Sequence, residues 1–187
     1  MKYSDYIKLQ KEKTCDPRRR KKWLNQEWDL KLSGFKKIFN SNFAYLGSDC
    51  LCIGARTGQE VQALIDLGRK AIGIDIVPCE PLVIEGDFHN LDFKDSSFDF
   101  IFSNVVDHAL YPDKFFSEIT RVSKENGSVL LHLQIDRGND KYGVYDINDL
   151  EEDVLKHLPG AEVIRFMDIQ YAEFNTFNKE LLLKIIK

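Results

Sequence analysis

The sequence predicts an α/β domain with a mostly parallel sheet that is covered by helices on both faces. From residue 49 onward, seven short strand-like runs alternate over most of the region with segments of helical periodicity. The first run, CLCI at 50–53, is apolar at every position, as expected for a strand buried on both faces. A glycine turn follows, and then QEVQALIDL at 59–67, whose apolar residues recur at helical spacing. Strand, turn and helix in this order indicate parallel strands joined by helical crossovers.

The later elements follow the same alternation. The other strand-like runs lie at 71–75, 81–87, 98–104, 128–135, 161–169 and 179–187. A helix is predicted from Pro112 to Val122, because proline is accepted in the first turn of a helix. A second one is predicted from Ile147 to His157, and the Asn126-Gly127 pair predicts a turn before the fifth strand.

The first 45 residues differ in character from the rest of the chain. They are polar, basic in the middle and aromatic toward the end. One or two helices are predicted here with a break at Asp16-Pro17, because a residue that precedes proline avoids helical geometry. We therefore expect an N-terminal helical cover segment at 1–45 and a second domain at 46–187.

Composition excludes several classes of protein. The chain has 187 residues, 43% apolar and 30% charged, which fits a globular protein. Its net charge of −4 gives no general attraction to nucleic acid or to an anionic membrane. No signal peptide or membrane-spanning run is present, and the four cysteines lack paired spacing. We therefore expect a reducing compartment, the cytoplasm or the nucleus, and no metal site.

The glycine turn CIGARTGQE at 52–60 indicates which cofactor classes fit. It lacks the spacing and the lysine of a P-loop. Arg56 and Gln59 stand where a dinucleotide fingerprint has its second and third glycines, and Glu60 in the first helical turn would repel a pyrophosphate. A nicotinamide-dependent reductase is therefore disfavoured. S-adenosylmethionine fits better because it carries adenine, ribose and an amino acid but no phosphate.

Ordered segments at consistent spacing carry a resemblance to a known family. They are CIGARTG, Asp75 at the end of the second strand, and EGDFHNLDFKDSSFDFIFSNVVDHAL from the third strand to beyond the fourth. In these segments the sequence resembles the class I S-adenosylmethionine-dependent methyltransferases, especially the small type 11 group, over about residues 49–135. The resemblance implies a doubly wound, Rossmann-like sheet of seven strands with the last one antiparallel. It also implies methyl transfer from S-adenosyl-L-methionine to an acceptor that the sequence does not identify.

The same resemblance implies roles for individual residues. The turn would approach the amino-acid part of the cofactor, Asp75 would bind the ribose and Ile76 would pack on the adenine. Asp87 would accept a hydrogen from the adenine amino group, with Phe88 as an apolar wall beside it. The remaining cofactor-binding candidates are Gly54, Ala55, Arg56 and Gly58 in the turn and Ser103 and Asn104 at the end of the fourth strand. Purely structural roles in turns are the alternative for the glycines and the aspartates.

Two departures from the family pattern leave a second function open. Cys52 stands where the family often has an acidic residue, and Arg56 replaces a frequent glycine. Arg56 could bind the carboxylate of the cofactor, bind an acidic group of the substrate, or project into solvent. The alternative function is a catalytically silent methyltransferase-like binding module or complex subunit.

Candidate catalytic residues follow the fourth strand. His108 matches a common family histidine and is the candidate general base, with a role in the pocket wall or in capping a helix as the alternative. Asp107 and Tyr111 are candidates for shaping the pocket. The run that would signal methylation of an exocyclic base amine is absent, and Asp107 and Asp136 alone make metal-assisted chemistry improbable. For the other histidines we expect a place near the adenine (His89), packing inside the fifth strand (His132) and a surface helix end (His157).

Selectivity must come from segments outside the cofactor half. The N-terminal segment and the loop at 136–148 are the available covers, and their aromatic residues either wall a pocket or dock helices onto the sheet. The acceptor is a small molecule, a protein or RNA, and a second copy of the chain could close the site. A basic cluster could contact RNA phosphates or form a solvated helix face; it consists of Arg18, Arg19, Arg20, Lys21 and Lys22.

Overall fold

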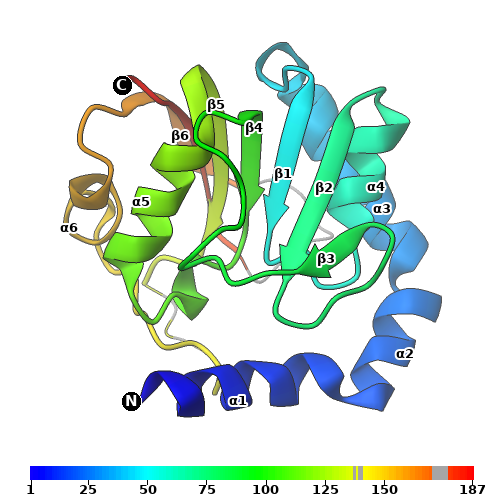
Figure 1. Ribbon diagram of the computed structural model, residues 1–187. Helices are drawn as coiled ribbons and strands as arrows, with labels where there is room; N and C mark the ends of the chain where they lie inside the picture. The colour runs from blue at the N-terminus through cyan, green and yellow to red at the C-terminus, as the bar shows by residue number, and fades with distance from the viewer. Residues whose placement is uncertain (137, 139–140, 170–176) are drawn as a thin grey trace.

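The computed structural model describes residues 1–136, 138, 141–169 and 177–187. Its strands form one seven-stranded sheet (Figure 1). The strand order is β3-β2-β1-β4-β5-β7-β6. β7 is antiparallel to β5 and β6, whereas the other neighbouring strands are parallel. The strands are β1 Asp49–Ile53, β2 Lys70–Asp75, β3 Val83–Glu85, β4 Phe98–Ser103, β5 Ser123–Leu133, β6 Glu162–Asp168 and β7 Lys179–Lys184. The predicted doubly wound sheet with an antiparallel last strand is confirmed.

Helices cover both faces of this sheet. The α-helices are α1 Tyr3–Cys15, α2 Pro17–Asn25, α3 Trp28–Ser41, α4 Gln59–Asp66, α5 Pro112–Val122 and α6 Leu150–Asp153. Short 3-10 helices lie at Phe43–Tyr45, Val106–His108 and Leu155–His157. Helix α5 has the predicted bounds. None of the helices within the described ranges combines the length and the apolar character that a membrane crossing needs.

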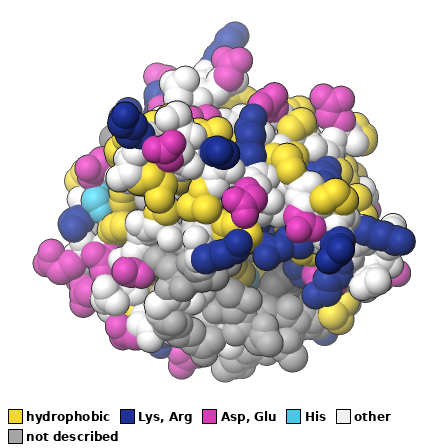
Figure 2. Space-filling model, turned by 90° about the horizontal axis from the view of Figure 1, so that it is seen from below, with side chains coloured by type: hydrophobic (Ala, Val, Ile, Leu, Met, Phe, Trp, Pro, Cys, Tyr) yellow, Lys and Arg dark blue, Asp and Glu magenta, His cyan; other side chains and the backbone are white. Residues whose placement is uncertain are grey.

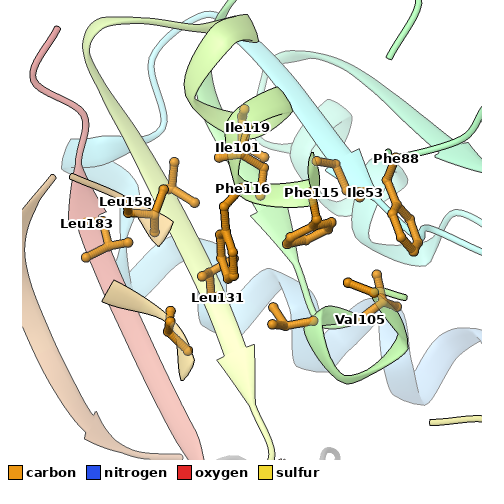
Figure 3. Close-up of a cluster of buried hydrophobic side chains, with 14 of the residues drawn as sticks. Ile53, Phe88, Ile101, Val105, Phe115, Phe116, Ile119, Leu131, Leu158 and Leu183 are labelled. Carbon is orange, nitrogen blue, oxygen red and sulfur yellow. The ribbon is translucent and has the colours of Figure 1, made fainter. Parts of the chain in front are cut away.

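Alternating side chains of the strands build one core on each face. In β1, Leu51 and Ile53 join the core under α5, where Phe115 and Phe116 are fully buried (Figure 3). Cys50 and Cys52 point to the opposite face and pack with residues of α3 and α4. Because both faces are covered, consecutive positions of the strand are all apolar, as the run CLCI predicted.

The N-terminal segment contains three helices, not the predicted one or two. The break at Asp16-Pro17 is confirmed, and Asp16 caps α2 by accepting the backbone N–H groups of Arg18 at 2.9 Å and Arg19 at 3.0 Å. A further break falls at 26–27, where neither glycine nor proline stands. Glu27 forms ion pairs there with Lys22 at 2.7 Å and Lys31 at 3.1 Å. Because ion pairs between separate helices have no sequence pattern of their own, this break could not be predicted from the sequence.

Two predicted bounds were wrong. The fifth strand begins at Ser123, so the Asn126-Gly127 pair lies within it; Asn126 has a φ of 61° and the pairing with β4 shifts register there. The pair therefore lies at an irregularity within the strand, between Ser123, which pairs with Phe98, and Ser128, which pairs with Phe100. The helix predicted at 147–157 is divided into α6 and a 3-10 turn by Val154, which has a φ of −127°.

The position of α1 decides what surrounds the site. Strands β1, β2 and β4 are parallel and end on the same edge of the sheet. Helix α1 runs across this edge (Figure 1). Ligands of open α/β sheets bind at the carboxyl ends of the strands. The N-terminal segment therefore covers the edge where the sequence places the cofactor.

Candidate functional site

The turn after β1 is tied to the neighbouring strand and packed against the loop after β4. The backbone N–H groups of Gly54 and Ala55 both donate to the carbonyl oxygen of Ile74, at 2.9 and 3.0 Å. Gly54 has a φ of 76°, and a Cβ atom there would lie 2.5 Å from Cγ2 of Val105. Gly58 has a φ of 90°. Packing against the protein therefore already requires a glycine at position 54, and a cofactor role for these glycines stays a prediction.

Asp75 lies at the end of β2 and is oriented by this turn. Its Oδ2 accepts the N–H of Arg56 at 3.2 Å, and its Oδ1 accepts the N–H of Val77 at 2.9 Å. Burial raises the pKa of its carboxyl group above the ordinary value, although these hydrogen bonds act in the opposite direction. The side chain lines a small cavity together with Ile76 and Phe88. The structure thus brings three predicted nucleoside-binding residues together.

Two cavities of different size lie along this edge. The larger cavity has a volume of about 400 Å³ and lies between the glycine turn, α2, α3 and the loop after β4; Trp23, Phe35, Gly54, Ala55, Arg56, Glu60, Asn104 and His108 are among its lining residues. The smaller cavity, between α1 and Asp75, has only about 40 Å³. Pockets that hold drug-sized ligands have about 300–1,000 Å³. The larger cavity therefore has the size of a ligand site, whereas the half that is predicted to hold the nucleoside is closed.

Two tyrosines of helix α1 close the half of the site that is predicted to hold the nucleoside. Tyr6 is 1% exposed and lines the smaller cavity. The hydroxyl of Tyr3 donates a hydrogen bond to Oδ2 of Asp87. Asp87 also accepts the backbone N–H of His89 at 2.9 Å, and its Oδ1 lies 3.0 Å from Nδ1 of the same residue. The carboxylate predicted to meet the adenine amino group is therefore engaged by the protein itself.

The ionisation of this cluster supports those hydrogen bonds. Burial acts to raise the pKa of Asp87, but the hydrogen bonds from His89 and Tyr3 outweigh it and lower the pKa below the ordinary value. Burial and the neighbouring carboxylate raise the pKa of Tyr3, so its hydroxyl keeps its proton. Tyr111 stacks on Tyr3 with ring centroids 5.8 Å apart. Tyr111 lines neither cavity, so its expected place in the pocket is not what the structure shows.

Arg56 is directed into the larger cavity. Its backbone has a φ of 47°, a conformation that residues other than glycine seldom adopt. Its guanidinium lies 4.4 Å from the ring centroid of Trp23, and both side chains line the cavity. The prediction that Arg56 projects into solvent is therefore wrong. The two other predictions, binding of the cofactor carboxylate and binding of an acidic substrate group, stay open.

His108 lies between the two cavities and is engaged by groups from α1 and the loop near 142. Its Nδ1 lies 3.0 Å from the carbonyl oxygen of Tyr142, so Nδ1 carries the hydrogen and Nε2 carries the lone pair. Nε2 lies 3.2 Å from Nζ of Lys13 and 3.7 Å from Oδ2 of Asp107. Lys13 lines both cavities, and sequence reasoning missed it because a lysine in a polar helix gives no signal of such a position.

The residues at the end of β4 take different positions. Ser103 is fully buried and its hydroxyl donates to the carbonyl oxygen of Ile53 at 3.2 Å, so it joins two strand ends and lines neither cavity. Asn104 lines the larger cavity. Both residues were predicted to line the methionine portion of the cofactor. Ser103 lines neither cavity, so this prediction is kept for Asn104 alone.

The basic cluster at 18–22 is partly engaged within the protein. Arg19 lies 5.1 Å from the ring centroid of Tyr142, and Arg20 donates to the carbonyl oxygen of Pro78 at 3.3 Å. Lys22 is paired with Glu27. Figure 2 shows a band of Lys and Arg side chains on the face seen from below, with acidic side chains among them. The RNA contact stays a prediction.

The remaining histidines have structural partners. His132 is buried inside β5, as expected, with Nε2 3.0 Å from Oε2 of Glu180. His157 ends the 3-10 helix Leu155–His157, as predicted, but its side chain is not on the surface: it stacks on Phe116 and lies 2.7 Å from Oδ1 of Asp113. No group of three or more His, Cys, Asp or Glu side chains suited to a metal ion occurs within the described ranges.

Comparisons with known proteins agree with this architecture. Residues 51–131 match the family model of a methyltransferase domain. The fold is similar to that of the Burkholderia thailandensis 1,6-didemethyltoxoflavin-N1-methyltransferase, which was solved with 1,6-didemethyltoxoflavin and S-adenosylhomocysteine bound. The TM-score is 0.77 and the identity 12%, and the alignment covers 100% of this chain and 92% of that one.

Two further solved structures show the same fold. One is an S-adenosylmethionine-dependent methyltransferase from Methanosarcina mazei, with a TM-score of 0.64 and 16% identity over 78% of this chain and 97% of that one. The other, from Haloferax volcanii, is a methyltransferase in complex with the activator Trm112, with a TM-score of 0.62 and 17% identity over 87% and 98%. A comparison with curated proteins finds no match. Residues 51–131 of the chain thus match a methyltransferase domain, and the whole chain has the fold of solved S-adenosylmethionine-dependent methyltransferases.

Proposed function

We propose that the chain binds S-adenosylmethionine along the carboxyl ends of β1, β2 and β4 and methylates an acceptor that enters the larger cavity. The observation that carries this proposal is the convergence on one edge of the glycine turn, Asp75 and a cavity of about 400 Å³. The match of residues 51–131 to a methyltransferase domain supports it.

The chemistry of the residues present fits each part of the cofactor. Asp75 offers carboxylate oxygens that can accept ribose hydroxyl hydrogens. Ile76 and Phe88 supply apolar surface for a base, and both line the cavity beside Asp75. Gly54, Ala55 and Asn104 line the larger cavity, where the amino-acid part would lie.

The chemical role of the protein is to align the reactants and to exclude water. S-adenosylmethionine supplies a sulfonium-bound methyl group that passes to a nucleophile by in-line displacement. His108 is proposed to take the proton of an acceptor that arrives protonated, at Nε2, once Lys13 moves from its position 3.2 Å away. Asp107, 3.7 Å from Nε2, would then stabilise the imidazolium.

The closed nucleoside half leads to a prediction about Tyr3. Since the smaller cavity holds only about 40 Å³, α1 must shift before a nucleoside can reach Asp75 and Asp87. Replacing Tyr3 by Phe removes the hydroxyl that engages Asp87. We expect S-adenosylhomocysteine to bind about 2- to 10-fold more tightly to this variant, because one hydrogen bond of the closed form is lost. Isothermal titration calorimetry measures this change.

Tyr111→Phe is the matched control for this experiment. It removes a hydroxyl from the same aromatic cluster without touching Asp87, so the affinity should stay within about twofold. Weaker binding by Tyr3→Phe would show that Tyr3 belongs to the bound form of the site, and the idea that it blocks the site would be wrong.

The proposed function itself is tested by binding and then by transfer. Titration with S-adenosylhomocysteine and with NADH should give binding of the first ligand alone. Radiolabelled S-adenosylmethionine would next be incubated with cell fractions that contain small molecules, protein or RNA. Label in one fraction identifies the acceptor class, including the RNA contact predicted for Arg18 to Lys22. No binding of S-adenosylhomocysteine would refute the proposal.

A further inference from the structure

Glu60 lines the larger cavity, and its carboxylate forms no ion pair with any side chain in the described part of the chain. Glu60 belongs to the first turn of α4, is 5% exposed and lines the cavity together with Gly54 and Ala55. The carboxylate accepts the backbone N–H of Glu60 itself, but no other residue in the described part of the chain donates a hydrogen bond to it or forms an ion pair with it. A buried carboxylate without a partner of opposite charge is costly in free energy. Such a group calls for a cation that the cavity can admit.

The other carboxylates of this cavity have partners. Glu27 pairs with Lys22 at 2.7 Å and with Lys31 at 3.1 Å. Asp107 lies 3.7 Å from Nε2 of His108. Among the carboxylates that line this cavity, Glu60 is therefore the one that forms no ion pair with a described side chain.

The groups that face Glu60 come from four elements. Arg56 of the glycine turn and Lys31 of α3 favour its charged form, whereas Asp75 of β2 opposes it. Cys52 of β1 lies close enough for the charge of Glu60 to raise the pKa of its thiol, in addition to the larger effect of burial. Burial raises the pKa of Glu60 itself to about 7. Near neutral pH the carboxyl group is therefore partly protonated, and a cation beside it would complete its ionisation.

We propose that Glu60 binds the α-ammonium group of the methionine part of S-adenosylmethionine. This inference rests on the proposed function, which places the amino-acid part of the cofactor beside Gly54 and Ala55. Glu60 lines the same cavity as these residues and interacts electrostatically with Cys52, the position where the sequence departs from the family by lacking an acidic residue. The negative charge absent from β1 is thus supplied from the first turn of α4.

A different role of Glu60 has different consequences. A carboxylate in the first turn of a helix stabilises that helix through its dipole. If this were its only role, replacing Glu60 by Gln would lower stability at neutral pH and leave ligand affinities unchanged.

The experiment compares two ligands and three proteins. S-adenosylhomocysteine carries the α-ammonium group, whereas 5′-methylthioadenosine lacks the whole amino-acid part. Wild type, Glu60→Gln and the control Glu27→Gln are titrated with both ligands between pH 5.5 and 7.5. Glu27 lines the same cavity but already has two lysine partners.

The expected result is a pH dependence that only the amino-acid ligand shows. A group with a pKa of about 7 is about one-tenth ionised at pH 6 and about three-quarters ionised at pH 7.5. Wild type should therefore gain up to about eightfold in affinity for S-adenosylhomocysteine over this interval. Glu60→Gln should bind it about tenfold or more weakly at pH 7.5 and lose this gain. Binding of 5′-methylthioadenosine should agree within about twofold between the two proteins, and Glu27→Gln should keep the dependence.

The melting temperature of the free protein gives an independent check. Because the folded-state pKa of Glu60 is raised from 4.5 to about 7, the native protein binds more protons than the unfolded chain between these values, and its stability falls as pH rises through them. Glu60→Gln should therefore melt at a higher temperature than wild type at pH 8, and not at pH 4.5. A lower melting temperature at pH 8 would show that the helix end already satisfies this carboxylate, and would overturn the assignment.

Failure of the two proposals can be distinguished. If wild type binds neither nucleoside, the proposed function itself is wrong. If wild type binds both ligands and Glu60→Gln binds S-adenosylhomocysteine equally well, only the role of Glu60 is overturned. Equal weakening of both ligands in Glu60→Gln would likewise overturn it, since the effect would then be structural.

Discussion

Replacing Asp75 by Ala is expected to weaken binding of S-adenosylhomocysteine by about 10- to 150-fold, or ~1.5–3 kcal/mol, the contribution of hydrogen bonds to a charged group. The carboxylate is held at the end of β2 by the N–H groups of Arg56 and Val77 and lines the cavity beside Ile76. Calorimetric titration measures the change. An affinity equal to that of wild type would remove Asp75 from the ribose role.

Asp99→Ala is the matched control for Asp75→Ala. Asp99 also accepts two backbone N–H groups, those of Ser48 at 3.0 Å and Asp49 at 2.8 Å. These residues lie at the start of β1, on the opposite edge of the sheet from the cavities. Both variants lose a carboxylate that organises backbone, so both should lose stability. Only Asp75→Ala should lose affinity for the ligand.

Gly54→Ala is expected to lower the free energy of unfolding by about 2–5 kcal/mol. The new side chain adopts a φ of 76°, which costs about 1–2 kcal/mol, and its Cβ would lie 2.5 Å from Val105, which adds an overpacking cost of about 1–3 kcal/mol. Chemical denaturation of the purified variant measures the free energy of unfolding.

A second glycine separates the two causes of this loss. Gly68 has a similar φ of 78°, but a Cβ added there would have no atom within 4 Å, so Gly68→Ala should cost only the backbone term. Adding Val105→Ala to Gly54→Ala should relieve the contact and make the two costs less than additive. If Gly54→Ala costs no more than Gly68→Ala, the packing against Val105 is not what requires glycine in this turn.

The sequence predicted the sheet well because its signals are local. The run CLCI shows burial on both faces, and Pro112 marks the start of α5, so strand and helix identities followed from short segments. The bounds that failed depend on distant contacts. The pair at 126–127 looks like a turn but lies within a strand whose pairing with β4 continues on both sides of it.

Only the site residues at the ends of strands could be predicted from the sequence. Asp75, Ile76 and Phe88 follow strands in the sequence, and the structure brings them to one cavity. Tyr3, Tyr6 and Lys13 come from a polar N-terminal helix whose docking position has no local signal. Glu60 was interpreted only as a group that repels pyrophosphate, because a sequence does not show that its carboxylate faces a cavity.

In the proposed function, the path of α1 along the sheet edge has a consequence for the rate of ligand exchange. Its tyrosines close the nucleoside half, while Lys13 near its end borders both cavities and faces His108. Departure of this one helix would therefore expose donor and acceptor compartments together. Ligand exchange would then be limited by a unimolecular opening step, so the observed association rate should reach a plateau as ligand concentration rises.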